Sequence, residues 1–113
     1  MVVADTGPIN YLVQIGEIRL LEVLYSNVSI PTAVAAELGA VGAPPVVRAW
    51  IDRPPVWLTV VAEVDNAMRL PVRLGAGETA AIQLAIGART PFLLMDDRKA
   101  VSVARELGLR AMG

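Results

Sequence analysis

The apolar and polar positions of the chain form two alternating patterns. Short runs of β-branched and other apolar residues, bounded by Gly, Pro, Asp or Asn, predict buried strands. Longer segments with apolar side chains three or four positions apart predict helices that bury one face. The predicted strands cover residues 2–4, 28–30, 57–61, 92–95 and, as a last incipient strand, 109–112; the predicted helices cover 6–16, 17–25, 32–38, 46–52, 78–87 and 97–107.

This alternation predicts an α/β fold, in which a parallel sheet of four to five strands lies between two layers of helices. We expect Thr6 to cap the first helix and Gly39 to end the third. Residues 40–45 have the composition of a flexible loop, and the pattern of residues 64–74 is ambiguous. Ligands of such sheets bind beyond the carboxyl ends of the strands, so candidate chemistry is sought there.

The amino-acid composition of the chain excludes several classes of function. The chain has 113 residues, of which 55% are hydrophobic, and we expect them to form a single domain. It contains neither Cys nor His, which excludes thiol nucleophiles, zinc–thiolate sites, histidine-ligated metals and triads that depend on His. The net charge of −1 argues against a protein that binds nucleic acid through charge alone.

Nothing in the sequence predicts membrane insertion or export. The N-terminal segment MVVADTGPIN lacks the basic region of a signal peptide, and no long apolar run is free of polar interruptions. We therefore expect a soluble, cytoplasmic protein.

The acidic residues fall into two groups. Six are expected to be solvated surface residues: Glu17, Glu22, Asp52 and Glu106 lie beside an arginine or on a polar helix face, and Glu63 and Asp65 are expected to lie in a loop. Five others are flanked by residues that belong in a protein interior. These are Asp5 after the first strand, Glu37 within AVAAEL, Glu78 within GAGETAAIQLAIG, and Asp96 and Asp97 after PFLLM.

These five acids predict a cation site, because clustered carboxylates in an apolar setting repel one another and are costly to ionise. Mg²⁺ and Mn²⁺ prefer carboxylate oxygens and would offset that cost. Each acid also has an ordinary structural interpretation. Asp5 suits a turn cap, Glu37 an exposed helix face, Glu78 the positive end of a helix dipole, and Asp97 a helix N-cap that is compatible with metal binding.

Two other families share part of this pattern. Asp5-Thr6-Gly7 matches the Asp-Thr-Gly motif of aspartic proteases, but Pro8 follows it and helical segments dominate the remainder, whereas such proteases are nearly all β. Phosphoacceptor receiver domains also place acids at strand ends, but they need a late strand-end lysine that this sequence lacks.

The ordered segments VVADTGPINYLVQIG, SIPTAVAAEL, LGAGETAAIQLA and FLLMDDRKAVSVAREL resemble the PIN-domain family, in particular its small prokaryotic branch related to VapC-type toxins. The resemblance covers nearly the whole chain. It implies a three-layer PIN-like fold and a Mg²⁺- or Mn²⁺-dependent endoribonuclease. It further implies RNA as substrate and a small antitoxin protein as a partner.

The resemblance also implies a site. Asp5, Glu37 and Glu78 match the acids of the first strand end, of the helix after the second strand, and of the long helix before the fourth strand. For the last acid, alignment on Arg98 favours Asp97, whereas the strand-end position favours Asp96, so both are retained. Thr6 matches a hydroxyl beside the first acid and is the expected substrate-orienting residue. The expected metal ligands are Asp5, Glu78, Asp96 and Asp97.

The function hypothesis is metal-assisted phosphodiester hydrolysis, in which Glu37 orients the attacking water or holds a second ion. The alternative is a catalytically inactive PIN-like module that binds nucleic acid or protein. PIN domains usually continue beyond the fifth strand, whereas this sequence stops at Gly113. The expected exposed apolar area predicts a homodimer. Its expected contact surfaces are Leu20, Leu21, Leu24 and Tyr25, and residues 46–51 with Trp50; Arg48, Arg53 and Arg98 would line a shared RNA groove.

Overall fold

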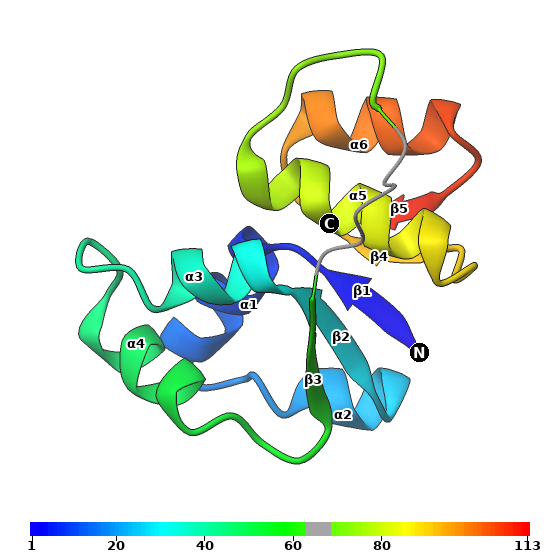
Figure 1. Ribbon diagram of the computed structural model, residues 1–113. Helices are drawn as coiled ribbons and strands as arrows, with labels where there is room; N and C mark the ends of the chain where they lie inside the picture. The colour runs from blue at the N-terminus through cyan, green and yellow to red at the C-terminus, as the bar shows by residue number, and fades with distance from the viewer. Residues whose placement is uncertain (63–68) are drawn as a thin grey trace.

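A computed structural model describes residues 1–62 and 69–113 of the chain (Figure 1). The ambiguous segment 64–74 therefore lies partly outside the described residues, and Glu63 and Asp65 lie wholly outside them. The elements follow the predicted alternation. They are β1 (Val2–Ala4), α1 (Thr6–Gln14), α2 (Leu20–Tyr25), β2 (Val28–Pro31), α3 (Thr32–Leu38), α4 (Pro45–Asp52), β3 (Leu58–Val61), α5 (Ala76–Gly87), β4 (Phe92–Leu94), α6 (Arg98–Glu106) and β5 (Arg110–Met112).

The strands form one five-stranded sheet in the order β3-β2-β1-β4-β5, and every pairing is parallel. This arrangement confirms the predicted α/β class. The chain moves outward from β1 through β2 to β3 and then returns to place β4 on the other side of β1. The strand order thus reverses between β1 and β4, and the carboxyl ends of these two strands flank the position where open α/β sheets bind ligands.

Each face of the sheet is covered by its own hydrophobic cluster. Alternate residues of β1 point to opposite faces, so Val2 and Ala4 join one cluster and Val3 joins the other. The first cluster contains buried side chains from α1, α2, α3 and α4, and the second contains those of α5 and α6. Figure 1 shows the same division, with α5 and α6 grouped apart from α1, α3 and α4. The sheet is therefore the middle layer of three.

Three local predictions were wrong in detail. The second helix starts at Leu20 rather than residue 17, because turns closed by Leu20 N–H to Glu17 O and Leu21 N–H to Ile18 O precede it. The helix α5 begins two residues earlier than predicted. Thr6 is not the N-cap of α1: Asp5 holds that position in extended backbone conformation, and its side chain makes no capping hydrogen bond.

The expected apolar contact surfaces also need correction. Leu21 is 3% exposed and belongs to the first core cluster, and Trp50 packs partly buried against the same cluster, with its ring centroid 6.1 Å from that of Trp57. The Leu21 side chain is therefore too buried to contact a partner, whereas Trp50 remains partly exposed. None of the helices among the described residues is long and apolar enough to cross a membrane.

Candidate functional site

The centre of the site is the junction of β1 and β4. Ala4 and Leu94 are register partners in these two strands, and the Asp5 N–H donates a hydrogen bond of 2.9 Å to the Leu94 carbonyl. Asp96 and Asp97 follow β4 after a single residue, Met95. The predicted placement of Asp5 and the aspartate doublet at adjacent strand ends is therefore confirmed.

Asp5 is unusual among the buried polar side chains. It is 4% exposed, and its Oδ1 atom is buried without a hydrogen-bond partner in the described part of the chain. Burial raises the pKa of the Asp5 carboxyl to about 6. The negative charges of Glu78, Glu37 and Asp96 raise the pKa as well, against the lowering effect of the Thr6 backbone N–H. Asp5 is thus a buried acid whose negative form is only partly compensated, by the Thr6 backbone N–H.

Glu37 connects three helices. It lies in α3, where its Oε1 accepts a 2.5 Å hydrogen bond from the Thr6 hydroxyl at the start of α1. Its Oε2 accepts a 3.1 Å hydrogen bond from the Gly77 N–H at the start of α5. The Thr6 hydroxyl therefore holds the Glu37 carboxylate toward the end of the sheet where Asp5 lies. The sequence did not predict this hydrogen bond.

Glu78 and Asp97 form a second contact between helix starts. Glu78 lies in the first turn of α5 and accepts a 3.1 Å hydrogen bond from the Gly75 N–H. Asp97 is the N-cap of α6 and accepts a 3.1 Å hydrogen bond from the Lys99 N–H, as the sequence predicted. Burial raises the pKa of Glu78, and the charge of Asp97 and a hydrogen bond between the two side chains raise it further.

Two glycines allow the carboxylates to approach neighbouring helices. A Cβ atom at position 7 would lie 2.4 Å from Asp96 Oδ1, and one at position 77 would lie 2.5 Å from Glu37 Oε1. Any larger side chain at either position would displace a carboxylate. Sequence reasoning did not single out Gly7 or Gly77 as site residues. The available signal was their position beside the acids, in DTG and GAGE.

The chemistry of these groups fits a divalent cation. The donors are carboxylate oxygens, which Mg²⁺ and Mn²⁺ prefer, and one of them is buried and unpartnered. In the described residues, no three acidic groups already converge on one ion-sized position. The positions available to hold an ion are those of Asp5, Glu78, Asp96 and Asp97.

The comparisons with known proteins agree with the fold. A model of a family described as a PIN domain matches the chain over residues 1–113. No curated protein matches the chain. PIN domains are generally nucleases and typically use divalent metal ions, which indicates a nuclease-type function here. Since the family match extends over the full sequence, this chain belongs to the PIN-domain family.

Proposed function

We propose that this protein is a Mg²⁺- or Mn²⁺-dependent endoribonuclease that hydrolyses RNA phosphodiester bonds. One observation carries the proposal: Asp5 is buried at the β1–β4 junction with an unpartnered Oδ1 and three other acids raising its pKa. A buried carboxylate that is only partly compensated is costly for a fold that gains nothing from it. A cation that binds this oxygen would remove the cost and supply the positive charge that phosphodiester hydrolysis needs.

The roles follow from the positions. Asp5, Glu78 and one of the Asp96–Asp97 pair would hold the ion, which when bound acts as a Lewis acid toward phosphate and acidifies a water. The two carboxylate oxygens of Glu37 accept hydrogen bonds from the Thr6 hydroxyl and the Gly77 N–H. When one of these hydrogen bonds breaks, the freed oxygen would orient the attacking water. Thr6 would orient substrate or water beside it. Without His or Cys in the sequence, carboxylates are the strongest bases near neutral pH at this end of the sheet.

We further propose that the enzyme is the toxin of a toxin–antitoxin pair and forms a homodimer. Support comes from exposed apolar side chains on α1 and α2. Leu20, Val23 and Leu24 of α2 are 44%, 78% and 67% exposed, and Tyr11 of α1 adds to this apolar surface at 63%. A cavity of about 300 Å³ lies within it, lined in part by Tyr11, Leu20 and Leu24. A second copy of the chain or a small antitoxin would bury this apolar area.

The competing function is a catalytically inactive PIN-like binding module. The separation of the acids in the described residues favours it, because a complete set of metal ligands is not preassembled. The two functions differ in one measurable property. If the protein is a nuclease, it breaks RNA phosphodiester bonds and needs Asp5 and a divalent ion to do so. An inactive binding module breaks no such bond.

The deciding experiment is cleavage of single-stranded and hairpin RNA by the purified protein in Mg²⁺ or Mn²⁺ and in EDTA. The matched variants are Asp5→Asn and Asp52→Asn, the second removing an exposed acid at the end of α4. We expect metal-dependent cleavage by the wild type and Asp52→Asn, and a loss of at least about 100-fold in Asp5→Asn. Cleavage that persists in EDTA or in Asp5→Asn would overturn the proposal.

A further inference from the structure

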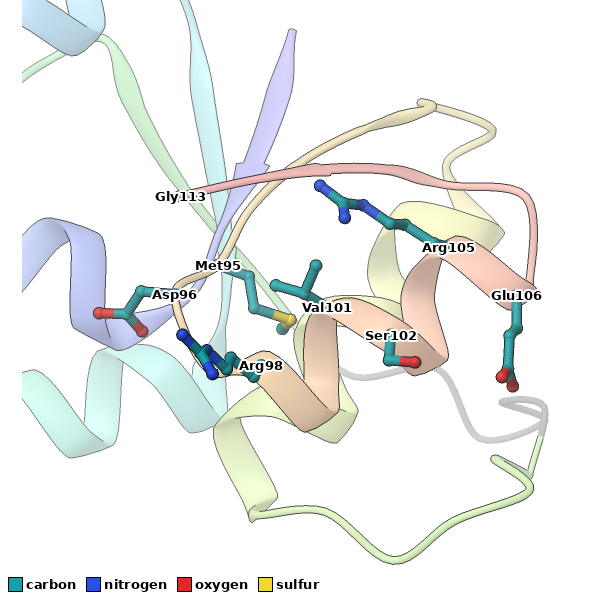
Figure 2. Close-up of a pocket in the computed structure, with 8 residues that line it drawn as sticks. All are labelled: Met95, Asp96, Arg98, Val101, Ser102, Arg105, Glu106 and Gly113. Atoms are coloured by element: carbon teal, nitrogen blue, oxygen red, sulfur yellow. The ribbon is translucent and has the colours of Figure 1, made fainter.

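A cavity of about 520 Å³ opens beside the candidate site, along one side of α6 (Figure 2). It begins at Asp96, one of the acids at the end of β4, and extends along the helix to its last turn. Its volume falls within the range of about 300–1,000 Å³ typical of small-ligand pockets. Eight residues line it: Met95, Asp96, Arg98, Val101, Ser102, Arg105, Glu106 and Gly113.

Three hydrogen-bond donors line this cavity from one face of α6. Arg98, Ser102 and Arg105 are spaced four and three residues apart, which places their side chains on the same side of the helix. Within residues 1–62 and 69–113, no hydrogen bond or ion pair engages the Arg98 guanidinium or the Ser102 hydroxyl. The Arg105 Nη2 donates a hydrogen bond of 3.1 Å to the Ala111 carbonyl. A guanidinium group has five N–H donors, so Arg105 keeps others for a ligand. Donor capacity therefore remains unused along the whole cavity.

An apolar surface separates the two arginines. Figure 2 shows the partly exposed Val101 side chain between the Arg98 and Arg105 side chains, with the fully buried Met95 side chain next to it. Guanidinium groups bind phosphate oxygens in a two-pronged geometry, and an apolar surface accepts the face of a nucleobase. A simple inorganic anion would use only the first of these features. A nucleotide would use both.

The acidic residues that line the cavity do not prevent a negatively charged nucleotide from binding. Two of the lining residues are acidic, Asp96 and Glu106. The Asp96 carboxylate lies beside Gly7 and points away from the space between the two guanidinium groups (Figure 2). The Glu106 carboxylate points away from the two guanidinium groups in Figure 2. The space between the arginines is therefore the positively charged part of the cavity.

We propose that this cavity binds a nucleotide of the RNA substrate adjacent to the cleaved phosphodiester, with Arg98 and Arg105 on its phosphate and Val101 under its base. The inference rests on the proposed endoribonuclease function and deepens it, because it assigns the path of the strand on one side of the acids. Arg98 and Arg105 are thereby substrate-binding residues, and neither is assigned a part in the chemical step. The expected groove of Arg48, Arg53 and Arg98 across a dimer is not required, since the cavity lies within one chain.

The test is binding of a fluorescent single-stranded RNA octamer, measured by anisotropy in EDTA so that binding is read without cleavage. The variants are Arg98→Gln and, as a second subsite variant that keeps the charge, Arg105→Lys. The matched control is Arg89→Gln, which removes the same charge before β4, at the opposite end of the strands. We expect roughly tenfold weaker binding by Arg98→Gln and an unchanged affinity in Arg89→Gln. The slope of log affinity against log salt should fall by about 0.7 for the lost phosphate contact.

Cleavage kinetics separate this subsite from the catalytic site. Arg98→Gln should raise KM with little change in kcat, whereas Asp5→Asn should lower kcat. Equal RNA affinity in the wild type, Arg98→Gln and Arg89→Gln would overturn the subsite while leaving the nuclease proposal intact. RNA binding that depends on Arg98 in a protein that cleaves no RNA would support the subsite and overturn the nuclease proposal instead.

Discussion

The two ends of the parallel sheet differ in whether their buried polar groups are hydrogen-bonded. At the amino ends of the strands, the hydroxyls of the buried residues Ser29 and Thr90 donate to Met1, the first to its sulfur at 3.3 Å and the second to its carbonyl at 3.2 Å. At the carboxyl ends, Asp5 is buried as deeply, yet its Oδ1 has no partner in the described part of the chain. Among the described residues, the buried hydroxyls at the amino ends are hydrogen-bonded, whereas one buried carboxylate oxygen at the carboxyl ends is not.

This difference supports the proposal that the carboxyl ends of the strands form the functional end of the sheet. Unsatisfied buried groups each cost about 1–3 kcal/mol, and a charged group costs more, so they persist where a ligand satisfies them. The acids that follow β1 and β4, together with those of α3 and α5, lie toward the carboxyl ends of the strands.

The largest effect is expected from an acid of the functional end. Glu78→Gln removes a charge that the ion would need, so cleavage efficiency, kcat/KM, should fall roughly 1,000-fold. Glu22→Gln, which changes an acid in the first turn of α2, should leave kcat/KM unchanged. Steady-state cleavage of one RNA substrate by both variants makes the measurement. Equal losses in the two would mean that the acids of the functional end are not special.

The next effect is on stability and follows from the pKa of Asp5, about 6 in the folded protein against an ordinary value of 3.8. The folded state binds this proton more tightly than the unfolded state. The stabilising contribution of the neutral carboxyl is therefore complete below pH about 4 and is lost as the pH rises through about 6. The loss is at most about 3 kcal/mol of the free energy of unfolding in metal-free buffer.

Urea unfolding at pH 4.5 and pH 7.5 measures this loss in wild type and in Asp5→Asn, whose amide cannot ionise. We expect the difference between the two proteins to change with pH in EDTA, and Mg²⁺ at pH 7.5 to stabilise the wild type more than Asp5→Asn. A wild-type pH dependence identical to that of Asp5→Asn would contradict the assigned burial cost.

A smaller effect on RNA cleavage is expected when one of the glycines that leave room for the carboxylates is replaced. Gly7→Ala would force the exposed Asp96 carboxylate to move, so cleavage should fall about tenfold while the melting temperature changes little. Gly87→Ala is the matched control, because nothing lies within 4 Å of a Cβ at that position. If Gly7→Ala cleaves RNA as well as Gly87→Ala, Asp96 is not a ligand and Asp97 is the remaining member of the doublet.

The smallest effect on the chemistry is expected away from both ends of the sheet. Leu24→Glu places a charge on the exposed α1–α2 surface and should dissociate the proposed homodimer, with a change in monomer stability within about 0.5 kcal/mol. Val56→Glu introduces the same charge at a residue that is 98% exposed and outside that surface. Sedimentation at micromolar concentration compares the two. A wild-type monomer would contradict the dimer.

The sequence predicted the strands and helices well because each apolar run is short and is bounded by Gly, Pro or an acid. It also predicted that Asp5 and the aspartate doublet lie together, since parallel strands bring their carboxyl ends to one edge. It did not predict the Thr6–Glu37 and Gly77–Glu37 contacts, because these depend on how α1, α3 and α5 pack. Likewise, Leu21 and Trp50 were expected on a contact surface but pack against the core. Helical spacing alone does not distinguish an inward apolar face from an outward one.

The most direct test of the central claim is a crystal structure grown with Mn²⁺, with the ion located by its anomalous scattering. The account predicts a Mn²⁺ ion bound to Asp5 Oδ1, together with Glu78 and at least one of Asp96 and Asp97. Metal–oxygen distances should be about 2.0–2.2 Å. Mn²⁺ bound only elsewhere, with Asp5 Oδ1 still unpartnered, would contradict the claim that this end of the sheet is a metal-dependent active site.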